Sequence, residues 1–180
     1  KRLRHAKQLC SLSLKHSGVE VVYAGDRGFW HEDQLFGLFP NKSSALDALR
    51  AVADQQRLCY GVLGLERLVQ GRSCFRYVLK RCAGACCGKE SLEGHQLRLV
   101  QAMESMRVQC WPYDGKVAVE ESSETLTQYH IINNWFYLGT VGSLQEAKSI
   151  NTTADCFDRD GYKILCKPLL SGKFNIIALE

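Results

Sequence analysis

Residues 59–87 of the chain read CYGVLGLERLVQGRSCFRYVLKRCAGACC, and this stretch holds five of the nine cysteines. Fourteen residues separate Cys59 from Cys74, seven separate Cys74 from Cys82, and three separate Cys82 from Cys86. Four thiolates at such short separations can enclose one metal centre, as all-cysteine sites do for zinc or an iron–sulfur cluster. The stretch therefore predicts a metal site on these four cysteines.

The same part of the chain is strongly basic. Between residues 57 and 89, seven Lys or Arg residues stand against a single acid, Glu66. Positive charge of this density suits a site whose thiolates are negative, and it also suits nucleic acid. The two interpretations are compatible, so both are kept.

A short helix is predicted over residues 72–81. On such a helix Arg72, Arg76 and Lys80 share one face at positions i, i+4 and i+8, and Arg81 follows them. We expect these four side chains to contact DNA phosphates. The alternative is that they only balance the charge of the thiolates and solvate the rim of the site.

The first residues of the chain are also basic and contain Lys1, Arg2 and Arg4. They predict either a solvated linker or an arm that contacts phosphates. No apolar segment follows them, so they do not form a secretory signal. Because the sequence begins with Lys rather than Met, we interpret it as a fragment of a longer protein.

Cysteine usage indicates a reduced compartment. Nine cysteines is an odd number in a chain without a secretion signal, which disfavours a disulfide scaffold. Adjacent Cys86 and Cys87 are also poor partners for each other, given the Cα separation that a disulfide prefers. The remaining four lie in apolar or strand-like segments and are expected to be buried; they are Cys10, Cys110, Cys156 and Cys166.

The composition fits a folded chain of 180 residues with 46% hydrophobic residues and no apolar run long enough to cross a membrane. The charge is uneven. Residues 1–107 hold seventeen Lys or Arg and ten Asp or Glu, whereas residues 108–180 hold six and nine. The first part is therefore expected to face an anionic partner.

Hydrophobic patterning predicts strands and helices in the first part. Short strands are expected at 9–14 and 19–23, and an apolar segment at 35–40 ends at a proline. A helix follows, capped by Asn41 or Ser43, and a second helix begins near Ser91. These elements form a small β layer with helices around the cysteine site.

Beyond residue 108 the pattern changes to strands. Alternation predicts strands over 111–121, 127–139, 162–170 and 174–179, with a short helix over 143–150 and a turn at 158–161. The expected fold is therefore α+β. A cysteine-centred unit, 1–107, precedes a mostly antiparallel β-rich unit, 108–180.

Six short motifs resemble one protein family. The motifs LFGLFP at 35–40, GRSC at 71–74 and KRCAGAC at 80–86 resemble the UvrC family of excinucleases. The motifs WP at 111–112, TQYHII at 127–132 and DGYKILCKPLL at 160–170 resemble a UvrC homologue of enteric bacteria. The resemblance covers essentially the whole chain.

The resemblance implies a role in bacterial nucleotide excision repair, in the cytoplasm. The parent protein is expected to cut damaged double-stranded DNA, presented by UvrB, on the 3′ side of the lesion. It implies a four-iron, four-sulfur cluster on Cys59, Cys74, Cys82 and Cys86, with zinc as the alternative. It also implies that a GIY-YIG nuclease domain lies N-terminal to this region.

No catalytic constellation is found in the sequence, and the residues of a GIY-YIG nuclease have no counterpart in it. We therefore expect the chain itself to bind DNA and UvrB without cutting DNA. Two other functions stay open. One is a structural zinc module without DNA affinity, and the other is a cysteine-dependent enzyme.

Overall fold

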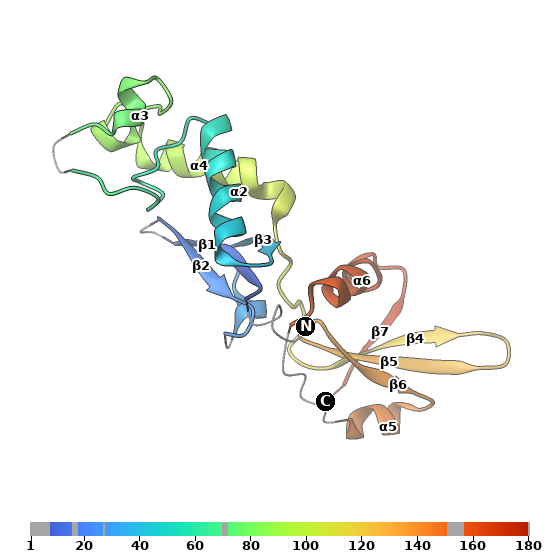
Figure 1. Ribbon diagram of the computed structural model, residues 1–180. Helices are drawn as coiled ribbons and strands as arrows, with labels where there is room; N and C mark the ends of the chain where they lie inside the picture. The colour runs from blue at the N-terminus through green and yellow to red at the C-terminus, as the bar shows by residue number, and fades with distance from the viewer. Residues whose placement is uncertain (1–7, 16–17, 27, 70–71, 151–156, 180) are drawn as a thin grey trace. The chain divides into compact units, whose positions relative to one another are not determined.

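A computed structural model of the protein describes residues 8–15, 18–26, 28–69, 72–150 and 157–179 (Figure 1). These residues form the predicted α+β fold, with one three-stranded and one four-stranded antiparallel sheet. The chain divides into two compact units. The first holds the described residues up to 23 together with 34–108, and the second holds 24–33 together with those from 109 onward. In the division expected from the sequence, at residue 107, residues 24–33 belong to the first unit; in the structure they lie in the second.

The first unit contains the sheet β2-β1-β3. Its strands are β1 (Cys10–Lys15), β2 (Gly18–Tyr23) and β3 (Leu35–Phe39). The central strand β1 is buried along nearly its whole length, and the Ser11 hydroxyl donates to the backbone oxygen of Phe36 at 3.2 Å. The strands that alternation predicted at the start of the chain are confirmed.

Two capped helices cover this sheet. In α2 (Lys42–Gln55) the N-cap Asn41 accepts a hydrogen bond from the Ser44 N–H at 2.9 Å, and in α4 (Leu92–Met103) Ser91 is the N-cap. A short 3₁₀ helix, η3 (Glu104–Met106), follows α4. Helix α2 packs on the sheet and α4 packs against α2 (Figure 1). The buried side chains between them include Leu12, Phe36, Leu49, Leu58, Leu99 and Met103.

The segment between α2 and α4 contains little regular structure. Its helices are the single turn α3 (Phe75–Val78) and the 3₁₀ helix η2 (Ala85–Cys87). The helix predicted over 72–81 is wrong, because Cys74 is extended and Lys80 adopts a left-handed φ of 58°. A single turn cannot align Arg72, Arg76 and Lys80 on one helical face.

The second unit contains the sheet β6-β5-β4-β7. Its strands are β4 (Val117–Ser122), β5 (Thr127–Asn133), β6 (Phe136–Val141) and β7 (Asn175–Ala178). The single strand expected over 127–139 is instead a hairpin. Asn134 and Trp135 form its turn, with left-handed φ values of 51° and 67°, as two-residue hairpin turns require.

Two α-helices lie on opposite faces of this sheet, α5 (Leu144–Ser149) and α6 (Arg159–Leu170) (Figure 1). The strand predicted over 162–170 is wrong, because this segment is α6. Asp158, which we expected to start a turn, is the N-cap of α6 and accepts hydrogen bonds from the Asp160 and Gly161 N–H groups. The buried residues of α6 recur at helical spacing; they are Tyr162, Leu165 and Leu169.

Aromatic side chains pack together in the second unit. The Trp135 ring lies 5.3 Å from that of Trp111 and 5.0 Å from that of Tyr162, measured between centroids. Phe29, from the 3₁₀ helix η1 (Phe29–His31), meets Phe157 at 5.5 Å. Such edge-to-face pairs add to the burial energy of the rings. None of the helices in the described ranges is long and apolar enough to cross a membrane.

The cap of α6 can be tested by mutation. Replacing Asp158 with Ala removes the acceptor for two N–H groups, so we expect the free energy of unfolding to fall by about 1 kcal/mol. The matched control is Asp160→Ala, which removes a first-turn acid that makes no cap and is expected to lose about 0.3 kcal/mol. Urea denaturation measures both. Equal losses in the two variants would contradict the helical assignment.

Candidate metal centre

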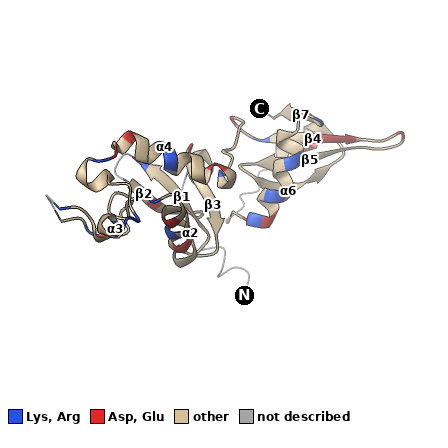
Figure 2. Cartoon of the chain, turned by 90° about the horizontal axis from the view of Figure 1, so that it is seen from above, with Lys and Arg blue, Asp and Glu red and all other residues tan. Residues whose placement is uncertain are grey.

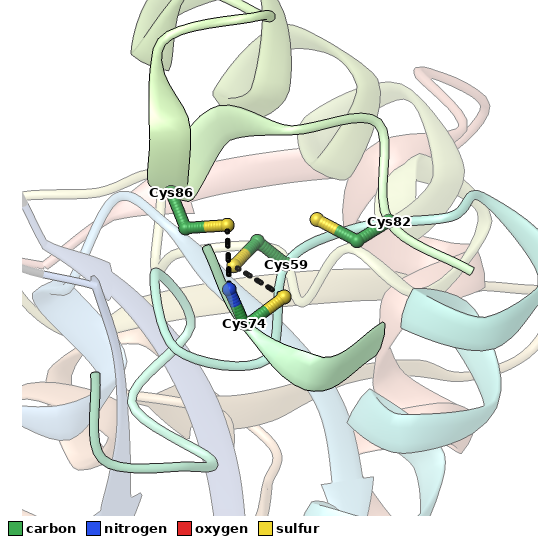
Figure 3. A group of neighbouring side chains, drawn as sticks. All are labelled: Cys59, Cys74, Cys82 and Cys86. Atoms are coloured by element: carbon green, nitrogen blue, oxygen red, sulfur yellow. Dashed lines mark hydrogen bonds between the residues drawn. The ribbon is translucent and has the colours of Figure 1, made fainter. Parts of the chain in front are cut away.

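Four cysteines converge in the loop-rich segment of the first unit. The Sγ atoms of Cys59, Cys74, Cys82 and Cys86 all lie within 4.8 Å of one another, and the Cys59 and Cys74 sulfurs are 3.9 Å apart. Figure 3 shows the four sulfurs turned toward a common centre. The first three of these residues are buried and Cys86 is half-buried. The four cysteines named from their spacing are therefore brought together.

Each thiol is carried by a different piece of backbone. Cys59 follows the end of α2, Cys74 precedes α3, and Cys86 lies within η2. The loop after α3 returns Cys82 to the group, with the Ala83 N–H donating to the Arg57 carbonyl at 3.0 Å. Because these pieces have little core of their own, a metal that binds all four thiols fixes the path of the chain between them.

Backbone N–H groups point at the sulfurs. The Gly84 N–H donates to Cys82 Sγ at 3.3 Å, and the Cys74 N–H donates to Cys86 Sγ at 3.4 Å. Hydrogen bonds of this kind stabilise thiolates and orient them toward a metal.

The same contacts act on the thiol pKa values. Burial raises the pKa of Cys59 and of Cys82, although backbone N–H groups act in the opposite direction at both. At Cys86, burial also opposes ionisation, but hydrogen bonds from the Cys74 backbone and from the neighbouring thiols hold its pKa below the ordinary value. A bound cation would displace the remaining protons, because a metal-coordinated thiol is deprotonated.

Gly84 allows the chain to wrap closely round the group. Its φ is 100°, and a Cβ at this position would lie 2.9 Å from a ring carbon of Tyr77 and 2.7 Å from Cβ of Lys89. Both the conformation and the space therefore require glycine. No sequence motif indicates this close approach of Tyr77.

The donor set can be compared with what each candidate metal requires. Four thiolates suit both a zinc ion and a four-iron cluster. In a zinc tetrahedron with Zn–S distances of about 2.3 Å, the sulfurs are about 3.8 Å apart. A four-iron cluster binds each thiolate to a different iron, so its sulfurs lie further apart than those around one ion. The observed separations, up to 4.8 Å, are closer to those around a single ion.

The other cysteines among the described residues lie outside the group. Cys87 is exposed, and its thiol donates to the Gly84 carbonyl at 3.4 Å. Cys10 is buried as expected, whereas Cys110 and Cys166 are only partly buried. Cys156 lies outside the described residues.

A cavity of about 410 Å³ borders the group on one side. It is walled mainly by apolar side chains such as Leu14 and Leu99, and Cys86 and His95 also line it. Cys86 is thus the thiol of the group that a small molecule in this cavity can reach.

Arg76, which the sequence predicts as a DNA contact, forms an ion pair within the chain. Its guanidinium pairs with Asp54 at 2.5 Å and lies 3.8 Å from the centre of the Tyr60 ring. Only 12% of the Arg76 side chain is exposed, whereas its partner is 56% exposed. The pair links α3 to the C-terminal end of α2.

Three further basic residues that the sequence predicts as DNA contacts lie at the surface of the described structure. Arg72, Lys80 and Arg81 are exposed. Figure 2 shows Lys and Arg on the loops that flank α3, and Asp and Glu on β4. Lys1, Arg2 and Arg4 lie outside the described residues.

His95 is a functional residue that the sequence motifs do not indicate. This side chain is 2% exposed, and its Nε2 accepts a hydrogen bond from the Cys59 N–H at 2.9 Å. Burial lowers the pKa of His95, which favours the neutral ring that can accept this bond. The available signal was a polar residue on a buried helical stripe, since His95, Leu99 and Met103 recur every four residues.

Comparison with known proteins gives the family. Residues 3–105 match the family described as UvrC/Cho excinuclease, middle domain, and residues 116–180 match the one described as excinuclease Cho C-terminal domain. The chain belongs to the UvrC/Cho family of excinucleases. The resemblance drawn from the short motifs is therefore confirmed.

Individual relatives are similar along the whole chain. It is 58% identical over 180 residues to excinuclease Cho of Shigella flexneri and of Escherichia coli K12, and 56% identical to that of Salmonella typhi. The match covers 100% of this chain and 61% of each relative. Comparison with solved structures gives no significant match.

The first test of the site removes one thiol at a time. In the Cys82→Ser chain we expect bound metal to be lost, because three thiolates cannot close the site. Cys87→Ser is the matched control and should keep the full amount. Elemental analysis of anaerobically prepared protein measures both. A Cys87→Ser chain without metal, beside a Cys86→Ser chain that retains it, would show that the ligand set is wrong.

The second test concerns His95. In the His95→Leu variant the Cys59 N–H loses its acceptor, so we expect the free energy of unfolding to fall by about 1–3 kcal/mol. Gln101→Leu places the same side chain at an exposed position of α4 and should change it little. Urea denaturation followed by circular dichroism compares the two. If both variants are equally stable, the hydrogen bond does not hold the Cys59 loop.

Proposed function

We propose that the chain is the DNA- and UvrB-engaging region of a Cho-like endonuclease. The parent protein makes the 3′ incision of nucleotide excision repair in the bacterial cytoplasm. The observation that carries the proposal is a four-thiol group set within a basic segment of a UvrC/Cho middle domain. The chain supplies binding, and the N-terminal GIY-YIG domain of the parent supplies the cut.

In this proposal a four-iron, four-sulfur cluster occupies the four-thiol group. The cluster is the cofactor that membership of the UvrC family implies, and the four-thiolate donor set is chemically suited to it. When bound, it supplies a cross-link that joins four separate points of the chain. The residues themselves hold this cross-link in place through the N–H groups of Gly84 and Cys74, and through His95 behind Cys59.

A structural zinc module is the second candidate, and the spacing of the sulfurs favours it. Separations up to 4.8 Å are close to those of a zinc tetrahedron, which are about 3.8 Å. In this second candidate function the zinc-binding chain does not bind DNA. Elemental analysis distinguishes the two candidates, because the cluster contains iron with inorganic sulfide and the module contains zinc.

DNA contact in this proposal comes from exposed cations around α3. Arg72, Lys80 and Arg81 contact phosphates directly, and Lys1, Arg2 and Arg4 form a second contact. Arg76 acts differently: its pairing with Asp54 and Tyr60 positions α3, which carries the neighbouring groups. Contacts of this kind read charge rather than base sequence.

UvrB is the protein partner in this proposal. Membership of a family of excinucleases supports this assignment, because such enzymes are expected to act on DNA that UvrB presents. No particular surface of the described residues is assigned to UvrB.

DNA binding by the chain is the experiment that tests the proposal. Affinity should be independent of sequence and fall with salt, by about one unit of log–log slope for each phosphate contact. Lys80→Ala should weaken binding uniformly and flatten this slope by about one. Lys163→Ala replaces an exposed lysine of α6 and should leave the slope unchanged. Fluorescence anisotropy over a range of salt measures all three proteins.

Two outcomes would contradict the proposal. Metal-loaded chain that fails to bind DNA at low salt would favour the structural zinc module. Metal-dependent nicking of supercoiled plasmid by the purified chain would favour an enzyme that carries its own cutting site. The nicking assay therefore accompanies the binding assay.

A further inference from the structure

Three apolar side chains of the α3 turn are unusually exposed. Phe75 is 72% exposed, Val78 is 67% exposed and Leu79 is 49% exposed. None of the three belongs to the buried core of the first unit. We refer to these three residues as the α3 patch. Single exposed apolar residues are common, but three on one turn, at positions i, i+3 and i+4, form a group of the kind that interaction sites use.

The α3 patch stands on a rigid support. The backbone of the turn is closed by hydrogen bonds from the Tyr77 N–H to Cys74 at 3.0 Å and from the Leu79 N–H to Phe75 at 3.2 Å. Phe75 directly follows one of the four converging cysteines, and the Arg76 side chain is held by Asp54. The aromatic ring therefore projects from a turn that is fixed on both sides.

The chain segment that carries the α3 patch is rich in cations, and Asp54, an acid that contacts α3, is paired with Arg76. Between residues 57 and 89 only one acid, Glu66, accompanies the exposed basic side chains. The exposed cations of this segment are Arg57, Arg67, Arg72, Lys80, Arg81 and Lys89. An apolar patch framed by cations complements a partner whose apolar surfaces lie next to negative charges.

We propose that the α3 patch, with Phe75 as its leading side chain, inserts into DNA where the base stack is disrupted and contacts unstacked nucleobases. Base faces are apolar and always lie close to phosphates, which the surrounding cations would bind. In an intact duplex the bases cover one another, so the patch reaches them only at a distorted site. Apolar wedges such as Phe and Leu act in this way in proteins that kink DNA.

This inference rests on the proposed function and makes it more specific. The cations provide affinity for any DNA, whereas the α3 patch provides a preference for disrupted DNA. The region would thus help to place the enzyme at the distortion that a lesion creates. It also gives a reason for a rigid metal-anchored loop, because a mobile aromatic side chain would fold back on its own surface.

The experiment compares two DNAs of the same length. One is a fully paired duplex, and the other contains a short mismatched bubble with a fluorescent adenine analogue. Phe75→Ala in the metal-loaded chain should weaken binding to the bubble about tenfold, and binding to the paired duplex less than about twofold. The rise in fluorescence that accompanies unstacking should also be lost. Because Phe75 is 72% exposed, metal content and thermal stability should match the parent chain.

Three further variants serve as controls for this comparison. Phe174→Ala removes a phenylalanine that is 48% exposed in the second unit, and should change binding to neither DNA. Lys80→Ala should weaken both complexes by the same factor, since it removes a phosphate contact. Phe75→Leu keeps an apolar wedge and should retain part of the preference for the bubble.

The binding measurements distinguish failure of the proposed function from failure of the α3 patch proposal. If the parent chain binds neither DNA, the proposed function fails and the wedge fails with it. If the parent chain binds both DNAs and Phe75→Ala changes neither affinity, or lowers both equally, only the wedge is wrong. If Phe75→Ala leaves both DNA affinities intact and weakens binding to purified UvrB, the α3 patch is a protein-docking surface and the nucleobase proposal is overturned.

Discussion

In the first unit, the path of the long loop between α2 and α4 depends on the approach of four thiols from separate parts of that loop. Between α2 and α4 the described residues form one helical turn and one 3₁₀ turn, too little to form a core of their own. Instead, the loop is organised around the four sulfurs, which lie within 4.8 Å of one another. A bound metal turns this proximity into a covalently linked framework, so that folding of the loop and binding of the metal become a single equilibrium.

The loop is also attached to the hydrophobic core of the first unit. His95 lies on the same buried stripe of α4 as Leu99 and Met103, and it accepts the N–H of Cys59. Beside it, Arg98 pairs with Glu90 at 2.6 Å and donates to the carbonyl of Gln56. The cysteine group is therefore fixed to the helix that packs in the core, and it is not a flexible appendage.

The features that could be predicted from the sequence are those that depend on residues close together in the chain. Asn41, which the sequence offers as a cap with Ser43 as the alternative, and Ser91, where a helix is expected to begin, each accept a hydrogen bond from a backbone N–H group of the following helix. The four cysteines could be named because their spacing is short. His95 could not be named as a functional residue, because its role depends on a residue 36 positions earlier in the chain.

Three segments were assigned wrongly because nearby contacts outweighed the pattern. The helix over 72–81 is stopped where Cys74 turns toward the other thiols and Lys80 adopts a left-handed conformation. The segment expected as a strand over 162–170 is a helix, because the Asp158 side chain caps the first N–H groups and the buried residues recur at helical spacing. The long strand over 127–139 folds back at Asn134, since burial of Trp135 compensates for two left-handed residues.

The distribution of aromatic residues makes the two units spectroscopically separable. All three tryptophans, Trp30, Trp111 and Trp135, belong to the second unit. Tryptophan emission therefore follows the second unit alone, whereas absorption from thiolates bound to iron would follow the first unit in a chain that carries the proposed cluster. Such a sample would hold two intrinsic labels, so the order in which its two units melt or respond to a partner could be followed without adding a dye.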